Sequence, residues 1–529
     1  MTAQSLGYKW LSDHYRVVPV QDFQITSALG PARRTVVVDG RVQEIYPATA
    51  AQPLTLRGQL SYALRHEGVH LEFLSRLFEV LSVEELSAWL AQERTGQYAR
   101  RAGFLYEWLT GRKLPDACVA TAGNYVDAIS SDDYFAAVRP VNNPRWRVRD
   151  NLPGTPEFCP LVRRTGAIQA AEKYDCAAAL EELNAEFGHD VLMRSAVWLT
   201  IKESRASFAI EHEQDQRDRI RRFAAVMERR IGQYPRLLSP ATLAELQQEI
   251  VSDRSTLSRF GLRSSPVFVG ETHQYEQIVH YIAPHWERVP GMLTGVEAFL
   301  ERTVGKSSVV RAGAAAFGFV FIHPLADGNG RIHRFLVNDV LRRDGAVPKP
   351  FVLPISAVIT EKPQNVVRYD EVLEQFSAPL MARYSDRYAF KDVRRKYQDG
   401  IESNFEFHAY DDALHAWRFP DLTAQAEYMA WVIDRTIHRE MRREADVLRE
   451  WTIARRMVKD IIDGPDADID RIIRSVRDNG GVLSNKLRKE FPVLQDPQIV
   501  EDLAMALRNA FKDFGGTGAL QRSADAAEE

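Results

Sequence analysis

Residues 323–334 read His-Pro-Leu-Ala-Asp-Gly-Asn-Gly-Arg-Ile-His-Arg. This window places a base, a carboxylate, a glycine-flanked amide and two guanidinium groups in one short segment. The apolar stretch 312–322 leads into it, and residues 335–341 have the apolar pattern of a helix that leads away. A polar, glycine-rich loop between two buried helices indicates a site for phosphate chemistry.

The glycines of this loop suit it to binding an anion. Gly328 and Gly330 have no Cβ, so backbone N–H groups around Asn329 can approach a phosphate closely. A helix that begins near Arg331 would point its unpaired N–H groups at the same anion. Asp327 offers the hard oxygen ligand that Mg²⁺ prefers where it bridges phosphates.

Basic side chains complete the predicted site. Arg331 and Arg334 are three residues apart, so both can lie on one helix face and bind phosphate oxygens in a bidentate manner. His323 precedes the glycines and, with an unperturbed pKa of about 6.5, can act as a general base. His333 lies between the two arginines and is expected to be a structural or surface histidine. The loop residues together predict a nucleotide phosphate site with a base beside it.

The segment resembles the signature of Fic-domain proteins, whose usual form is HPFx(D/E)GNGRxxR. Every fixed position matches except that Leu325 stands where phenylalanine is usual, which keeps an apolar anchor beneath the loop at a smaller volume. The resemblance covers roughly residues 190–385. It implies a mainly α-helical fold, in which a helical Fic core carries a β-hairpin flap and is flanked by mostly helical N-terminal and C-terminal modules.

The same resemblance implies an activity, transfer of AMP from ATP to a tyrosine, serine or threonine hydroxyl of a target protein. His323 would deprotonate the hydroxyl, and Asp327 would hold Mg²⁺ on the phosphates of ATP. The other loop residues would bind the nucleotide: Gly328, Asn329 and Gly330 as the anion hole, Arg331 along the phosphate chain and Arg334 at the γ-phosphate. Two alternatives use the same site, namely removal of AMP from a modified protein and transfer of another nucleotide or phosphate-containing group.

A second segment, Ser207 to Glu211, resembles the inhibitory-helix motif of this family, (S/T)xxxE(G/N). There the glutamate pairs with the second signature arginine, here Arg334, and displaces the γ-phosphate, because two anions compete for one guanidinium. His212 departs from the usual glycine or asparagine. The resemblance implies autoinhibition by a helix at about 200–213; the alternative is an ordinary charged helix surface.

Residues 263–282 resemble the flap that lies over the site in this family. An exposed strand edge there can bind an extended peptide through main-chain hydrogen bonds, which suits a protein target. The alternative is a plain surface hairpin.

The chain is expected to divide into three parts. Residues 1–190 form a module of unknown role, with a hairpin at 34–46, helices over 57–111 and an irregular, proline-rich connection at 131–163. Residues 191–390 form the Fic domain. Around the start of this domain, residues 177–212 and residues 216–232 are each expected to form one helix.

Residues 391–529 are expected to be charged and helical throughout. A long helix is predicted over 425–462, and 467–491 reads as a helix, a glycine turn and a second helix from Ser484. This pattern supports an alternative of another class, a DNA-binding regulator in which Lys486, Arg488 and Lys489 meet phosphates. The structural alternative is a helical hairpin packed on the Fic core.

Composition limits the remaining function classes. The chain has 529 residues, 45% of them apolar and 26% charged, with a net charge of −4, so no global attraction to nucleic acid or anionic lipid is expected. Three separated cysteines indicate reduced thiols. Without a signal-like apolar segment at the start or a stretch of about 20 apolar residues, we expect a cytoplasmic protein and no membrane partner. A secreted bacterial effector and a homo-oligomer are both compatible with the Fic resemblance.

Overall fold

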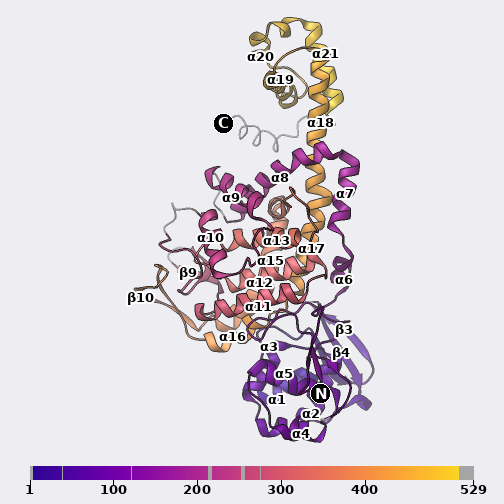
Figure 1. Ribbon diagram of the computed structural model, residues 1–529, viewed down its shortest axis with the longest axis vertical. Helices are drawn as coiled ribbons and strands as arrows, with labels where there is room; N and C mark the ends of the chain where they lie inside the picture. Colours follow the sequence, from indigo (N-terminus) through magenta and orange to yellow (C-terminus); the bar gives the residue numbers. More distant parts are fainter. Residues whose placement is uncertain are drawn as a thin grey trace.

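The computed structural model describes residues 4–38, 40–120, 122–211, 217–251, 257–273 and 276–511. The fold is mainly helical, as predicted, with small sheets at its edges (Figure 1). Buried apolar side chains among these residues gather in three clusters, which follow one another along the long axis. Within the described ranges, no helix combines the length and the apolar character needed to cross a bilayer.

The N-terminal unit packs helices against a small mixed sheet with the strand order β1-β2-β4-β3. The hairpin predicted at 34–46 is confirmed by the antiparallel pair β3–β4, although Asp39 of its turn lies outside the described residues. The helices predicted over 57–111 are also present. The elements are β1 (Ser5–Leu6), α1 (Gly7–Tyr15), β2 (Ile25–Gly30), β3 (Arg34–Val38), β4 (Arg41–Pro47), α2 (Leu56–His66), α3 (Leu71–Val80), α4 (Val83–Gln92) and α5 (Gln97–Thr110).

The connection at 131–163 is mostly irregular, as its prolines predict, but it is packed. Trp146 lies buried against α5, where a Cβ on Gly103 would come within 2.3 Å of the indole ring. Glycine is therefore required at that point of the helix, because a side chain would displace the ring. Short strands not predicted from the sequence lie in this connection and just before it: β5 (Val126–Asp127), β6 (Val141–Asn143) and β7 (Val148–Asp150).

The prediction of a single helix over 177–212 is wrong. Gly188 has a φ of 83°, which ends α7 (Cys176–Phe187) and lets α8 (His189–Ile210) begin in a new direction. The helix predicted at 216–232 is present as α9 (Arg217–Arg230). Two further helices were not predicted, α6 (Gly166–Lys173) and α10 (Pro240–Val251).

The central unit is built around α12 (Ser308–Ile322), which is buried on nearly every side. Small residues let its neighbours approach closely: a Cβ on Gly313 would lie 3.0 Å from the Cβ of Met429 on α17. The helix must therefore stay narrow, and a larger residue would separate the two backbones. It packs against α6, α11 (Val289–Arg302), α13 (Asn329–Arg343) and α17 (Thr423–Arg435), and its Phe321 ring contacts Phe376 of α15 (Pro363–Tyr384). The central unit also contains α14 (Ile355–Thr360) and α16 (Tyr410–Arg418).

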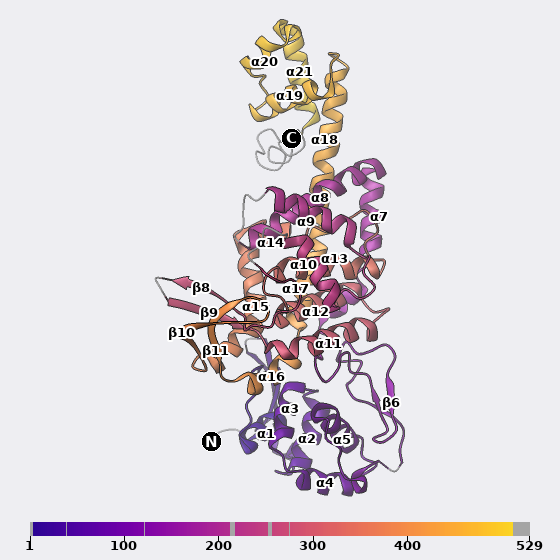
Figure 2. The ribbon, with the colours of Figure 1, turned by 60° about the vertical axis from the view of Figure 1, so that its left-hand side comes forward.

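Two hairpins project from one side of the central unit (Figure 2). The hairpin predicted as the flap is present as β8 (Phe268–His273) and β9 (Glu276–Ile282). The expectation that the chain is helical throughout after 390 is wrong, because β10 (Tyr388–Lys396) and β11 (Glu402–Phe407) form a second hairpin. Its aromatic residues alternate and pack on the flap: the Phe268 ring lies 5.4 Å from that of Phe390 and 4.8 Å from that of Phe405.

The long helix predicted at 425–462 is present as α17, a π-helical segment at Thr436–Met441 and α18 (Arg442–Lys459). It carries a small helical unit beyond the central one, drawn in yellow in Figure 1, which has its own apolar cluster. The helices of this unit are α19 (Asp466–Asp478), α20 (Asn485–Glu490) and α21 (Pro497–Ala510). The predicted helix, turn and helix are thus observed, but the alternative of a hairpin packed on the Fic core is wrong.

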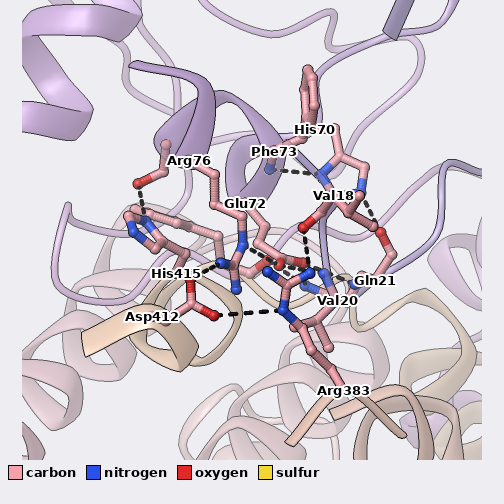
Figure 3. Close-up of polar contacts among 12 residues, drawn as sticks. Val18, Val20, Gln21, His70, Glu72, Phe73, Arg76, Arg383, Asp412 and His415 are labelled. Atoms are coloured by element: carbon pink, nitrogen blue, oxygen red, sulfur yellow. Dashed lines mark hydrogen bonds and ion pairs between the residues drawn. The ribbon is translucent and has the colours of Figure 1, made fainter. Parts of the chain in front are cut away.

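A buried polar network fastens the N-terminal unit to the central unit (Figure 3). Glu72 of α3 is fully buried and accepts hydrogen bonds from Arg76 Nε at 2.9 Å and from the backbone N–H of Val20 at 2.6 Å. Arg76 also donates to Asp412 of α16 at 2.9 Å and to Tyr384 of α15 at 3.2 Å. Burial raises the pKa of Glu72, but Arg76 and the backbone donors hold it below its ordinary value. The network therefore keeps a charged pair inside the junction.

Candidate functional site

The loop between α12 and α13 is bounded by left-handed backbone at both ends. His323 ends α12 with φ 49° and ψ 60°, and its N–H donates to the Phe319 carbonyl at 2.9 Å. Gly328 precedes α13 with a φ of 87°. Few non-glycine residues adopt a positive φ, so the conformation of His323 depends on contacts that hold its backbone.

Asn329 closes the loop from within. Its side chain accepts from the Leu325 N–H at 3.0 Å and donates to the Leu325 carbonyl at 2.8 Å. Leu325 itself is fully buried, as expected of the apolar anchor. Since the Asn329 side chain is used to brace the loop, any contribution of this residue to an anion hole would come from its backbone N–H.

The ring of His323 is oriented to accept a proton. Its Nδ1 lies 3.2 Å from the Val320 carbonyl, which can only accept, so Nδ1 carries the hydrogen and Nε2 keeps its lone pair. Burial and, to a smaller extent, the nearby charge of Arg263 lower the pKa of His323 to about 4, against a smaller opposite effect of the Val320 carbonyl. At neutral pH the imidazole is thus neutral and can act as a base.

Arg263 was not predicted as a site residue, yet it holds the end of α12. Its Nε donates to the His323 carbonyl at 2.7 Å, and its backbone N–H donates to the Pro324 carbonyl at 2.9 Å. Nη2 donates to the Pro284 carbonyl at 2.6 Å, and burial lowers the pKa of the guanidinium to about 10. These contacts join the start of the flap to the loop. No local sequence pattern predicts them.

Gln247 of α10 is a second residue that was not predicted. Its Nε2 donates to the Asp327 carbonyl at 2.8 Å, and its Oε1 accepts from the Gly261 N–H at 2.7 Å. Asp399, in the turn of the second hairpin, accepts from the N–H of Ser264 and from the hydroxyl of Ser265, each at 2.7 Å. The loop, the base of the flap and the second hairpin are therefore linked by buried hydrogen bonds.

The structure brings the two signature arginines together with the Ser207–Glu211 segment. Both guanidinium groups are only 2% exposed. Arg334 Nε donates to Ser207 Oγ at 2.6 Å, and Nη2 donates to the Ser207 carbonyl at 3.1 Å and to Glu211 Oε1 at 2.5 Å. Arg331 Nε lies 2.9 Å from Glu211 Oε2. One carboxylate thus contacts both arginines across the start of α13.

Gly330 leaves the space that this carboxylate occupies. A Cβ at this position would lie 2.4 Å from Glu211 Oε1, closer than side chains approach one another. The glycine therefore serves an anion beside the helix, and in this structure that anion is the carboxylate of Glu211. His212, next in the chain, lies outside the described residues.

Asp327 faces the open side of the loop, with a side chain 47% exposed. Its Oδ1 accepts from the Gly328 N–H at 2.6 Å and lies 3.3 Å from Arg331 Nη2. The described residues contain no group of three or more acidic, histidine or cysteine side chains that could hold a metal. A lone exposed carboxylate fits Mg²⁺, which binds through one or two carboxylates together with substrate phosphates and water.

His333 is structural, one of the two roles expected for it. Its Nδ1 lies 2.7 Å from the Ala316 carbonyl, and its ring packs edge-on against Phe317 with centroids 5.0 Å apart. Burial lowers the pKa of His333 to about 4, so this side chain is a neutral member of the α12–α13 packing.

Replacing Arg263 with methionine is expected to lower the turnover of this site by about 10²-fold, since a displacement of about 1 Å at the base has that effect. Loss of the nearby charge should also move the acidic limb of the pH–rate profile upward from about 4, toward the ordinary histidine value. Activity requires the neutral imidazole, so the variant should lose rate at a higher pH as the solution is acidified. Profiles between about pH 3 and 8 for both proteins measure this; an unchanged limb with equal rates would contradict it.

Comparison with known proteins agrees with this geometry. Residues 237–341 match the model of the Fic/DOC family, a range that contains the whole loop. Protein adenylyltransferase fic-1 from Caenorhabditis briggsae is 26% identical over 115 residues, which are 21% of this chain and 20% of that protein. The alignment therefore spans about a fifth of the relative's length.

Two solved structures are also similar. A Fic family protein from Desulfovibrio desulfuricans is 19% identical, with a TM-score of 0.34, over 70% of this chain and 90% of that one. A Fic domain-containing signaling protein from Bacteroides thetaiotaomicron is 14% identical, with a TM-score of 0.30, over 53% and 93%. The family model and the form of the loop at 323–334 together show that residues 237–341 of this chain are a Fic/DOC domain.

Proposed function

We propose that this protein is an adenylyltransferase that transfers AMP from ATP to a hydroxyl side chain of a protein target, and that Glu211 holds it inactive. The observation that carries the proposal is that the carboxylate of Glu211 contacts both signature arginines. Its Oε1 lies 2.5 Å from Arg334 Nη2, and its Oε2 lies 2.9 Å from Arg331 Nε. The adenylyltransferase activity printed for the Caenorhabditis relative supports the choice of reaction.

In the proposed reaction, Nε2 of His323 takes the proton of the target hydroxyl. The hydroxyl oxygen then attacks the α-phosphorus of ATP, the bond from that phosphorus to the bridging oxygen of the β-phosphate breaks, and pyrophosphate leaves. The products are an AMP ester of the target, pyrophosphate and a proton on His323. In this proposal the backbone N–H groups of Asn329 and Gly330 and the guanidinium of Arg331 stabilise the negative charge that develops on the phosphates.

Magnesium would neutralise phosphate charge during this transfer, and Asp327 is the residue that would hold it. The carboxylate is exposed at the mouth of the loop, while its backbone carbonyl is fixed by Gln247. The orientation of Asp327 therefore does not depend on the nucleotide.

Inhibition follows from competition between anions. In this structure Ser207 and Glu211 occupy Nε and Nη2 of Arg334, so a γ-phosphate could bind this side of the guanidinium only by displacing the carboxylate. A hydrogen bond between charged groups is worth about 1.5–3 kcal/mol. Removing the carboxylate should therefore raise productive ATP binding on the order of 10- to 100-fold.

The test is self-labelling of the Glu211→Gly variant with ATP that carries its label on either the α- or the γ-phosphate. We expect the variant to incorporate the α-label far more than the wild type does, and neither protein to retain the γ-label. A variant that stays silent with ATP, GTP, CTP and UTP would contradict the proposal. Incorporation of the γ-label would assign phosphate transfer, and release of AMP from an AMP-modified protein would assign the reverse reaction.

The target itself is proposed to bind along the flap. Both outer edges of the two-stranded β8–β9 hairpin are free of further strand pairing among the described residues, so an extended segment could add to it. The packing of the Phe268 ring on the second hairpin makes this edge a supported platform for a peptide.

A further inference from the structure

Helix α8 carries a second carboxyl on the face that holds Glu211. Glu203, Ser207 and Glu211 are spaced four residues apart, so they lie in one row along the helix. Glu203 is 0% exposed, and the reaction proposed above makes no use of it. A fully buried acid in line with the inhibitory pair requires a structural reason.

The partner of Glu203 is the beginning of α14. Its Oε2 accepts from the backbone N–H of Ser356 at 2.7 Å, and its Oε1 accepts from the Ser356 hydroxyl at 2.7 Å. Pro354, which precedes α14, makes no side-chain cap hydrogen bond, so an N–H of the first turn depends on a group from elsewhere. Glu203 supplies that acceptor across the helix–helix interface.

This contact and the arginine contacts act on different points of one helix. Eight residues of α-helix separate Glu203 from Glu211, a rise of about 12 Å. One end of the row is fixed on α14 through Ser356, and the other end lies on α13 through Arg334. Two fixed points on one face determine both the rotation of α8 and its position along its axis.

We propose that Glu203 is the positioning residue of the inhibitor: by capping α14 it sets α8 so that Ser207 and Glu211 reach Arg334. This inference rests on the proposed function for its effect on catalysis, but the docking of α8 is a structural property that can be measured separately. Ser356 of α14 and Arg334 of α13 are the polar and charged groups that face Glu203.

Burial raises the pKa of Glu203 to about 7, although the Ser356 donors and Arg334 lower it. Because the pKa of Glu203 is raised in the folded protein, the protonated side chain stabilises the docked helix. This contribution is fully present below the pKa of the unfolded state and is lost as the pH rises through about 7. Docking of α8 should therefore weaken between pH 6 and 8, and inhibition should weaken with it. Glu203→Gln cannot titrate and keeps an acceptor for the Ser356 N–H.

The experiment compares Glu203→Ala and Glu203→Gln by amide hydrogen exchange of residues 203–211 and by self-labelling with α-labelled ATP. The alanine variant should exchange at least 10-fold faster over this segment and label more strongly than the wild type. The glutamine variant should remain protected and inhibited, with a dependence on pH between 6 and 8 flatter than that of the wild type. In the Glu211→Gly background, Glu203→Ala should add no further labelling, because the carboxylate that Glu203 positions is already absent.

The outcomes separate the two proposals. A silent Glu211→Gly variant defeats the proposed function, whereas faster exchange in Glu203→Ala would still support the positioning role. Unchanged exchange and unchanged labelling in a folded Glu203→Ala protein would overturn the positioning role alone. If that variant does not fold, Ser356→Ala removes one donor to Glu203, and it should raise exchange over 203–211 by a smaller factor; no rise would overturn the inference.

Discussion

Replacing His323 with alanine in the Glu211→Gly protein is expected to reduce self-labelling by about 10²- to 10⁴-fold, the usual contribution of a positioned general base. The ring holds its Nδ1 against the Val320 carbonyl, which leaves Nε2 as the only lone pair on this side chain. Alanine removes that acceptor while leaving the arginines and the glycines in place. Initial rates of α-label incorporation measure the change.

The control for this prediction is His408→Ala, which removes an exposed histidine that follows β11 and should leave labelling unchanged. Affinity for ATP should also be similar in the His323→Ala protein and its parent, since the phosphates are bound by other residues. Labelling that survives the loss of His323 within a factor of about 3 would show that another group accepts the proton, and would remove the proposed mechanism.

Replacing Arg76 with alanine is expected to lower the free energy of unfolding by about 3–5 kcal/mol, because it leaves the buried carboxylate of Glu72 without its counter-charge. The same change removes the hydrogen bonds that tie α3 to Asp412 and Tyr384. Urea denaturation followed by circular dichroism measures the loss, which should appear in the transition that includes the N-terminal unit.

Arg383→Ala is the matched control at the edge of the same network. Its side chain is 32% exposed and lies 3.5 Å from Asp412, so its loss should cost under about 1 kcal/mol. The pKa of Glu72 is depressed in the folded protein, so its contribution is present above the unfolded value and is lost as the pH falls through the folded one. Equal stability of the two variants at pH 7 would contradict this account.

The loop at 323–334 could be predicted because its chemistry is contiguous in the sequence. Its backbone conformation follows from glycines, and its two arginines share a face through helical spacing alone. The residues that support it could not be predicted, because Arg263 and Gln247 reach the loop only after the flap and α10 have folded over it. An arginine that bonds carbonyls has no partner charge that a sequence pattern could reveal.

The secondary structure was predicted wrongly where the local preference of the sequence and the tertiary packing disagree. Residues 388–396 are rich in charges, which favoured a helix, but the alternating aromatics Tyr388 and Phe390 pack with Phe405 and make a strand. At Gly188 a single positive φ divides a stretch whose apolar spacing looks continuous. The Ser207–Glu211 spacing was recognised in the sequence, whereas Glu203, one turn earlier, was not, because its partner Ser356 lies on another helix.

The contacts that shape the loop come from the loop itself, from α10 and from the segment before the flap. Asn329 bonds both backbone groups of Leu325, Gln247 holds the carbonyl of Asp327, and Arg263 holds that of His323. The loop is therefore fully shaped while Glu211 occupies the two arginines. Under the proposed function, inhibition and activity differ only in which anion lies beside these arginines, so the transition between them requires a vacated position and no rebuilding of the loop.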